Sequence, residues 1–222
     1  MIDIILSDEF RQLAPGYRMI LFEADVVNAE PPEALTTEID RFAQSMCEIM
    51  QIEDINKRPG IAATRAAYKR FGKDPNRYRP SQEQMSRRII KGLGLYHVNA
   101  LADLGNLLSL KTGCALGVFD SAKIQGNCLT LGRGKENEEY VGIGRGPLNV
   151  SGLPIVRDEV GGIGTPTSDH ERTSVDLSTT HVVITFHLYG ESEMPEPDII
   201  TEAQRLLETY AEATNIEYRI VK

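Results

Sequence analysis

The sequence predicts an α+β fold in which a helical N-terminal layer packs on a hairpin-rich antiparallel or mixed β layer. Apolar residues at helical spacing dominate the first half, whereas from Gly113 onward short β-prone runs alternate with Gly, Asn and Asp. The 222 residues, 41% of them hydrophobic, contain no internal repeat, low-complexity tract or linker. We therefore expect one domain over residues 1–222, with 1–55 as its N-terminal extension and 190–222 as a C-terminal helix and strand.

Two strands and a long helix are expected in the N-terminal extension. Alternating apolar residues predict a short strand over Ile2–Leu6, and Tyr17–Val27 indicates a second one. Pro31-Pro32 opens a helix, because proline is tolerated in the first helical turn. This helix carries an apolar stripe at helical spacing, made of Leu35, Ile39, Phe42, Met46, Ile49 and Met50.

Two further helices are expected between residues 60 and 91. The first covers Gly60–Phe71 and ends at Gly72. The second begins near Ser81, where Ser81 and Gln84 have the spacing of a capping box. Its apolar side faces the core, so Arg87 and Arg88 on the other flank can present cations to solvent.

A leucine-rich helix is expected over Asn99–Leu110. Asp103 and Asn106 are three residues apart and therefore share one face of this helix. Two short polar side chains on an otherwise apolar helix need partners if they are buried.

The second half of the chain predicts hairpins that are closed by one helix and one strand. The β-prone runs are Leu116–Phe119, Cys128–Leu131, Tyr140–Ile143, Pro154–Val156 and His181–Tyr189. A last amphipathic helix follows from about Pro197 to Thr214, and Ile216–Val221 returns as an edge or closing strand.

Charge is strongly segregated along this acidic chain. The chain carries a formal net charge of −8, but the window Lys57–Lys91 holds eleven Lys or Arg residues and only two acids, Asp74 and Glu83. Such a window predicts either a surface that binds an anion or two helices with solvated basic sides. The acidic whole argues against indiscriminate nucleic-acid binding and is compatible with docking a structured nucleic acid.

Bulk features exclude several protein classes. No apolar run approaches the length that crosses a bilayer, and the acidic N-terminus is unlike a signal peptide. Three widely spaced cysteines exclude a simple disulfide framework and a cysteine-rich zinc site. We therefore expect a cytoplasmic protein without membrane contact. The sequence leaves the oligomeric state open.

Familiar catalytic and cofactor motifs are missing from the sequence. There is no nucleophile elbow, and Gly132–Glu136 lacks the spacing of a phosphate loop. His181 and His187 face the same side of one strand without a third ligand, so no metal or other cofactor is expected. The glycine cluster Gly161–Gly164 allows either close approach of a ligand or tight turns.

A longer pattern links the chain to a known family. Residues 65–81 read R-A-A-Y-K-R-F-G-K-D-P-N-R-Y-R-P-S, which fits the pattern R-x-x-Y-x-x-F-G-x-x-P-x-x-Y-x-x-S. With Asp103, Asn106 and Phe119-Asp120, this run resembles the B3/B4-type tRNA-binding editing domain of the bacterial phenylalanyl-tRNA synthetase beta subunit. The likeness spans roughly residues 78–180 and is closer to stand-alone proteins built on that domain.

The resemblance implies a pocket for an amino acid esterified to a terminal adenosine. It assigns catalytic positions to Asn106 and Glu138, with Glu139 as the fallback if the alignment slips by one residue. It assigns substrate-binding positions in the glycine-rich loop and in one strand, namely Gly161, Gly162, Gly164 and Gly117. Gly117 stands where the synthetase has a histidine, so one proton carrier of the family is missing here.

Three functional hypotheses follow. The resemblance favours a hydrolase that deacylates mischarged aminoacyl-tRNA through a positioned water and does not itself aminoacylate tRNA. In this hypothesis cations from the basic window contact the RNA phosphates, namely Arg77, Arg79, Arg87 and Arg88. The alternatives are a non-catalytic tRNA-binding or RNA-binding module and a protein that binds a free amino acid or a related metabolite.

Overall fold

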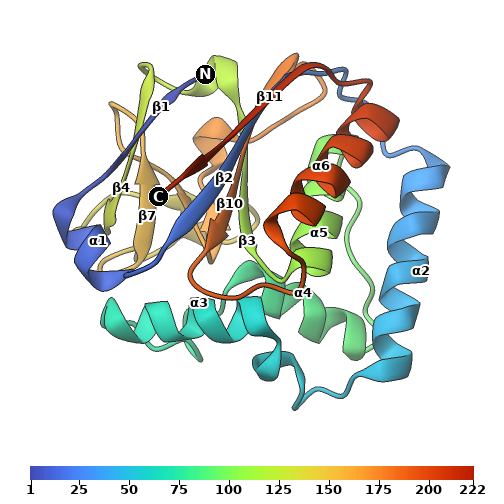
Figure 1. Cartoon of the computed structure of the whole chain (residues 1–222), viewed down its shortest axis with the longest axis horizontal. Helices are drawn as coiled ribbons and strands as arrows, with labels where there is room; N and C mark the ends of the chain where they lie inside the picture. Colours follow the sequence, from blue (N-terminus) through green and yellow to red (C-terminus); the bar gives the residue numbers. More distant parts are fainter.

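The two longest strands form the middle of a four-stranded antiparallel sheet. In the computed structural model, which describes residues 1–222, β2 (Arg18–Asp25) pairs with β10 (His181–Leu188) along its full length. β11 (Thr214–Val221) and β3 (Ala115–Asp120) complete the sheet in the order β11-β2-β10-β3. Both middle strands are apolar on both faces, as expected of strands that are covered on two sides (Figure 1).

A second sheet packs against one face of the first. Its order is β1-β4-β7-β8-β9, with β1 parallel to β4 and the remaining pairs antiparallel. The strand bounds are β1 Asp3–Leu6, β4 Cys128–Arg133, β7 Pro154–Arg157, β8 Gly162–Thr165 and β9 Ser168–Asp169. A small separate hairpin joins β5 (Val141–Gly142) to β6 (Gly146–Pro147).

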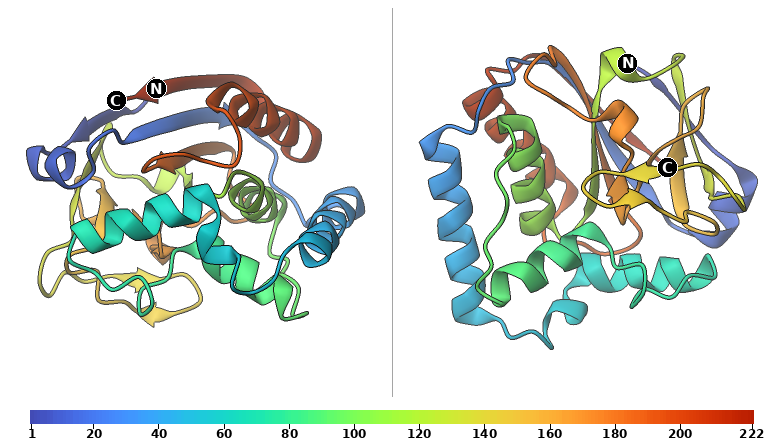
Figure 2. Two further views of the ribbon diagram at one scale, coloured as in Figure 1. Left: turned by 60° about the horizontal axis from the view of Figure 1, so that its bottom comes forward. Right: turned by 180° about the vertical axis from the view of Figure 1, so that it is seen from behind.

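Most of the helices cover the other face of the four-stranded sheet and its lower end, whereas the short first helix packs with the second sheet (Figures 1 and 2). Their bounds are α1 Asp8–Leu13, α2 Glu33–Ile49, α3 Pro59–Arg70, α4 Ser81–Ile90, α5 Ala100–Thr112 and α6 Glu196–Ala211. One-turn 3₁₀ helices lie at Ile55–Lys57, Ser121–Lys123 and Glu171–Thr173. None of the helices combines the length and the apolar character that a bilayer crossing requires.

Two apolar layers meet on the four-stranded sheet. On one side Ile20 and Phe22 of β2 pack with leucines of α5 and α6. On the other side Met19 and Leu21 of the same strand pack with apolar residues of the second sheet and with Phe119. The chain thus forms the helical layer and the mixed β layer that the sequence predicts.

The structure departs from the sequence prediction at four places, the first of which is the short helix α1, which is not predicted from the sequence. Gly162–Thr165 is a buried strand, not a turn, and no glycine from 161 to 164 has a positive φ. No capping box forms at α4, because the Gln84 amide donates to the Pro80 carbonyl and its side chain donates to the Arg79 carbonyl. Ile49, expected in the apolar stripe of α2, is 80% exposed at the last position of that helix.

Candidate functional site

The centre between the two sheets holds the ring of Phe119, which is fully buried. A Cβ atom added at Gly117 of β3 would lie 2.4 Å from the ring carbon Cζ, and one at Gly164 of β8 would lie 2.7 Å from it. Both glycines therefore leave the space that the Phe119 ring fills. A ligand can enter at this centre only if the ring moves away from the two glycines.

The other glycines between residues 161 and 164 make contacts within the protein. Gly162 lies under Ile155 and Tyr140, at 2.6 and 3.0 Å from where its Cβ would be. The amide of Gly161 donates to the Asp158 carboxylate at 3.1 Å. Strand β8 lies between β7 and β9, so its backbone is paired on both edges. The cluster thus presents no loop of free amides to a ligand.

Asp169 of β9 is the carboxylate that the structure places at this centre. Its Oδ2 accepts a hydrogen bond from the Val118 amide at 3.1 Å, and its Oδ1 lies 3.0 Å from where a Cβ of Gly164 would be. Burial raises the pKa of Asp169 to about 8, although the Val118 amide opposes this shift. A carboxyl group that is kept neutral near pH 7 is a typical sign of a functional site. The only sequence signal for Asp169 is an acid that closely follows the glycine cluster.

Asn106 belongs to α5, which packs on the face of β3 opposite to the Phe119 ring. Its neighbour Gly105 packs so closely on β3 that an added Cβ would lie 2.8 Å from Cγ2 of Val118. Val118 is the residue whose amide binds Asp169. The Asn106 side chain is half-buried and makes no hydrogen bond within the protein. It is therefore available to a ligand on the side of β3 that α5 covers.

Glu138 lies in an ion pair instead of an open site. Arg157 of β7 donates to both of its carboxylate oxygens, at 2.8 and 2.6 Å, and the Lys135 amide adds a bond of 2.8 Å. Burial alone would raise the pKa of Glu138, but these bonds outweigh it and hold the pKa below its ordinary value. No hydrogen bond joins Glu138 to Asn106 or Asp169, and no pattern in the sequence indicates that Arg157 is its partner.

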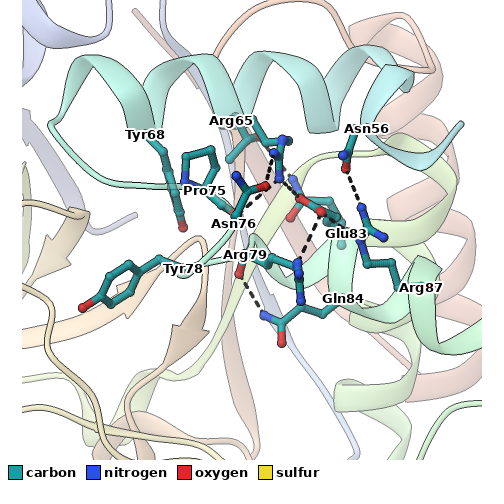
Figure 3. A network of polar contacts seen from close by, with 12 residues as sticks. Asn56, Arg65, Tyr68, Pro75, Asn76, Tyr78, Arg79, Glu83, Gln84 and Arg87 are labelled. Carbon is teal, nitrogen blue, oxygen red and sulfur yellow. Dashed lines mark hydrogen bonds and ion pairs between the residues drawn. The ribbon is translucent and has the colours of Figure 1, made fainter. Parts of the chain in front are cut away.

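The basic window forms a network around the buried carboxylate of Glu83, which Figure 3 shows. Arg65 and Arg87 bind it at 2.8 and 2.9 Å, and Arg79 lies 3.7 Å away. Three arginines thus surround one carboxylate, which leaves a local excess of positive charge. Arg79 is about half exposed, so its guanidinium remains in contact with solvent.

The other two predicted RNA-binding arginines pack on aromatic rings. The guanidinium of Arg88 lies 4.0 Å from the centre of the Tyr96 ring. The guanidinium of Arg77 lies 5.6 Å from the Tyr78 ring, and the ammonium of Lys73 lies 4.2 Å from it. Figure 3 shows Tyr78 beside the Glu83 network. Arg88 and Arg77 thus each lie against an aromatic ring.

A buried chain of polar side chains runs along β10 behind the centre. The Tyr17 hydroxyl lies 2.6 Å from Nδ1 of His187, and Nε2 of His187 lies 3.1 Å from the Thr185 hydroxyl. Thr185 Oγ1 would lie only 2.8 Å from a Cβ at Gly117. Burial lowers the pKa of His187 to about 4, so its imidazole is neutral near pH 7. The sequence placed His187 on the strand without indicating these partners.

Two cavities differ sharply in character. A narrow gap between the sheets is lined by Gly164 and Thr165 on one side and by His187 and Tyr189 on the other. An open surface cleft of about 490 Å³ lies near Arg18 and the loop before α6. This cleft contains none of the residues assigned from the sequence. No group of three or more His, Cys, Asp or Glu side chains is arranged to hold a metal ion.

The chain is similar in sequence to known proteins. The chain is 31% identical over 134 residues to the phenylalanine–tRNA ligase beta subunit of Brucella abortus, and this match covers 58% of the chain but 15% of that protein. It is 35% identical over 106 residues to the same subunit of Bartonella quintana, a match that covers 47% of the chain and 13% of that protein. The chain therefore corresponds to less than a sixth of the length of these relatives.

A solved structure and a family description also match. An N-terminal fragment of the phenylalanyl-tRNA synthetase beta subunit from Pyrococcus horikoshii superimposes with a TM-score of 0.45 at 10% identity, over 99% of this chain and 54% of that one. The description of the B3/4 domain matches residues 63–220, which include most of α3 and nearly all of β11. Since this match covers more than half of its residues, the chain belongs to the B3/4 domain family.

Proposed function

We propose that this protein hydrolyses the ester bond of mischarged aminoacyl-tRNA. The family membership and the likeness to phenylalanine–tRNA ligase beta subunits support this reaction class. The observation that carries the proposal is the carboxyl group of the half-buried residue Asp169, which binds the Val118 amide of β3 beside Gly164 of β8 and whose pKa is raised to about 8. A carboxyl group held neutral by burial ionises when a cation arrives beside it. The α-ammonium group of an aminoacyl ester supplies such a cation.

The role proposed for Asp169 is supported by its position, and the role proposed for Asn106 is supported by the resemblance to the editing domain. Asp169 binds the ammonium group of the amino acid, and Asn106 contacts the ester or the amino-acid side chain. A water molecule attacks the ester carbonyl, and the tetrahedral intermediate then releases the free amino acid and the ribose hydroxyl of the tRNA. Entry of the substrate displaces the ring of Phe119 from Gly117 and Gly164. The cations of α3 and α4 contact phosphates of the tRNA.

Glu138 is the competing carboxylate for the ammonium-binding role. The resemblance favours it, but its two oxygens are bound by Arg157. An ammonium group would have to compete with a guanidinium for the same carboxylate. The neutral carboxyl of Asp169 meets no such competitor, so we place the role there.

The experiment measures the release of amino acid from a panel of mischarged tRNAs by the purified protein. We expect release faster than in buffer for at least one tRNA, loss of that release in Asp169→Asn, and retention of much of it in Glu138→Gln. The absence of release across the panel would exclude the hydrolase. Loss in Glu138→Gln with full activity in Asp169→Asn would instead move the site to Glu138.

One observation favours a second candidate function, a non-catalytic tRNA-binding module. The Phe119 ring fills the space beside Gly117 and Gly164, so the centre is closed in this structure. A binding module predicts tRNA affinity that falls steeply with salt, together with no deacylation. Calorimetry with free amino acids and with RNA tests the third alternative, a metabolite-binding protein, because that alternative predicts binding of a free amino acid and no binding of RNA.

A further inference from the structure

The segment between α4 and α5 exposes an unusual amount of apolar surface. Residues 91–98 form no helix or strand, yet three of their large apolar side chains lie mostly in solvent. Leu93 is 58% exposed, Tyr96 is 71% exposed and Val98 is 59% exposed. Neighbouring exposed apolar side chains of this kind mark an interaction surface more often than scattered single ones do.

This segment is fixed at both ends by specific bonds. At its start the Leu93 amide donates to the Arg88 carbonyl at 3.1 Å, and the Arg88 guanidinium donates to the Leu93 carbonyl at 3.3 Å. At its end the carboxylate of Asp103 binds Nδ1 of His97 at 2.6 Å and the amide of Val98 at 3.0 Å. Asp103 is 1% exposed, so its partners on the segment satisfy a carboxylate that is buried in the helical layer.

The Tyr96 ring is stacked on one face and open on the other. The Arg88 guanidinium covers one face of its ring at 4.0 Å, while most of the side chain remains in solvent. The Leu93 carbonyl fixes the Arg88 guanidinium on that face. The side chain most exposed on this segment is thus an aromatic ring that is ordered before any partner arrives.

The chemistry of this pair fits an unpaired nucleic-acid base. Proteins hold single-stranded RNA by stacking its bases on aromatic rings and arginine planes beside cations that contact the phosphates. The strongly basic window Lys57–Lys91 ends where the segment begins, and Lys91 is exposed. An acidic protein partner would pair with the cations, but it would offer no flat base to stack on the open face of the Tyr96 ring.

We propose that Tyr96 and Arg88 form a stacking platform for an unpaired base of the RNA that contacts the basic window. The proposal rests on the RNA binding included in the proposed function and adds where one base is held. Asp103 is a positioning residue for this platform, since it fixes His97 and Val98 and does not contact the base.

The test uses the full chain with two probes, an unacylated tRNA transcript and a single-stranded RNA 12-mer that carries 2-aminopurine. Tyr96→Leu removes the ring and keeps an apolar side chain. We expect it to bind both probes about 5- to 100-fold more weakly and to lose the quenching of 2-aminopurine fluorescence that stacking causes. Tyr96→Phe keeps the ring and should bind as the wild type does.

Two measurements separate stacking from charge. Arg88→Gln should reduce the slope of log affinity against log salt by about 0.7 to 0.9 for each phosphate that the guanidinium neutralises in the wild type, whereas Tyr96→Leu should leave that slope unchanged. Tyr218→Leu is the matched control, because Tyr218 on β11 is 47% exposed and its ring packs at 5.7 Å from that of Phe22, without an arginine. This control should bind both probes normally.

The outcomes distinguish this inference from the proposed function. If the wild type binds neither probe, both the proposed RNA binding and the stacking platform are wrong. If the wild type binds and Tyr96→Leu binds equally well, the platform alone is wrong. Misfolding does not confuse these results, because the Tyr96 side chain is mostly in solvent and the thermal midpoint of the variant checks its fold.

Discussion

The Asp169 carboxylate accepts a hydrogen bond from the amide of Val118, on the last strand of the four-stranded sheet. β3 has no further strand beyond it, so a side chain from the second sheet takes up a backbone donor that would otherwise be unpaired at this edge. One carboxyl group therefore joins the two sheets at the proposed site and carries the raised pKa there. Changes at Asp169 should alter both stability and function.

The stability of the protein should depend on pH through Asp169. Folding raises the pKa of Asp169 from 3.8 to about 8, so between these pH values the folded state binds more protons than the unfolded state. The Asp169 contribution to the free energy of unfolding therefore falls as pH rises through this range. Asp169→Asn keeps an oxygen acceptor for Val118 and should be more stable than the wild type at pH 8, with a smaller advantage at pH 5. Urea unfolding at both pH values measures the difference; an equal difference at both would contradict the assignment.

The contribution of His187 has the opposite sign. Folding lowers the pKa of His187 from 6.5 to about 4, so between these pH values the unfolded state binds more protons. The contribution of His187 to stability is therefore complete above about pH 6.5 and is lost as pH falls towards 4. His187→Gln should remove this acid-dependent loss in urea unfolding curves measured from pH 7 to 4. The control His181→Gln, at a partly exposed position on the same strand, should retain it.

The glycines at the centre should not tolerate alanine. In Gly117→Ala and Gly164→Ala the new methyl group would lie within 3 Å of the Phe119 ring, and we expect each variant to lose about 1–3 kcal/mol of unfolding free energy. Gly161→Ala is the matched control, because no atom lies within 4 Å of its added Cβ. Thermal and urea unfolding measure these losses. A normal stability for Gly117→Ala would show that the Phe119 ring moves aside at little cost.

The carboxylate of Glu83 should be essential for the arrangement of the basic surface. Glu83→Gln removes the negative charge between Arg65, Arg79 and Arg87 and leaves their charges uncompensated around a buried side chain. We expect a loss of about 1–3 kcal/mol in urea unfolding, since hydrogen bonds to a buried carboxylate are lost while the partly exposed arginines can still reach solvent. Asp54→Asn, which breaks an exposed pair with Lys57, should change stability little. An equal loss in both variants would mean that the Glu83 network is not special.

Periodicity predicted most of the fold because burial produces it. Leu35 and Ile39 of α2 and the apolar residues of β2 are buried as their spacing indicates. Strand β8 escaped prediction because Gly162 and Gly164 have no side chains from which a period of two can be recognised. The ion pair between Glu138 and Arg157 and the bond between Asp169 and Val118 join residues 19 and 51 positions apart. Patterns within a short stretch of sequence do not indicate partners this distant. The position of Asp169 at the centre is therefore visible only in the tertiary structure.

Strand β2 has a consequence for how the chain is made. It lies between β11 and β10, although the match to the B3/4 family begins only at residue 63. A ribosome releases β2 long before β10 and β11, so the four-stranded sheet cannot close until both of these later strands have emerged. Pairing partners this distant in sequence make folding slow, because much chain entropy is lost before the contacts form. We propose that residues 1–222 fold as one unit and that removing the first 62 residues leaves β10 and β11 without their common neighbour.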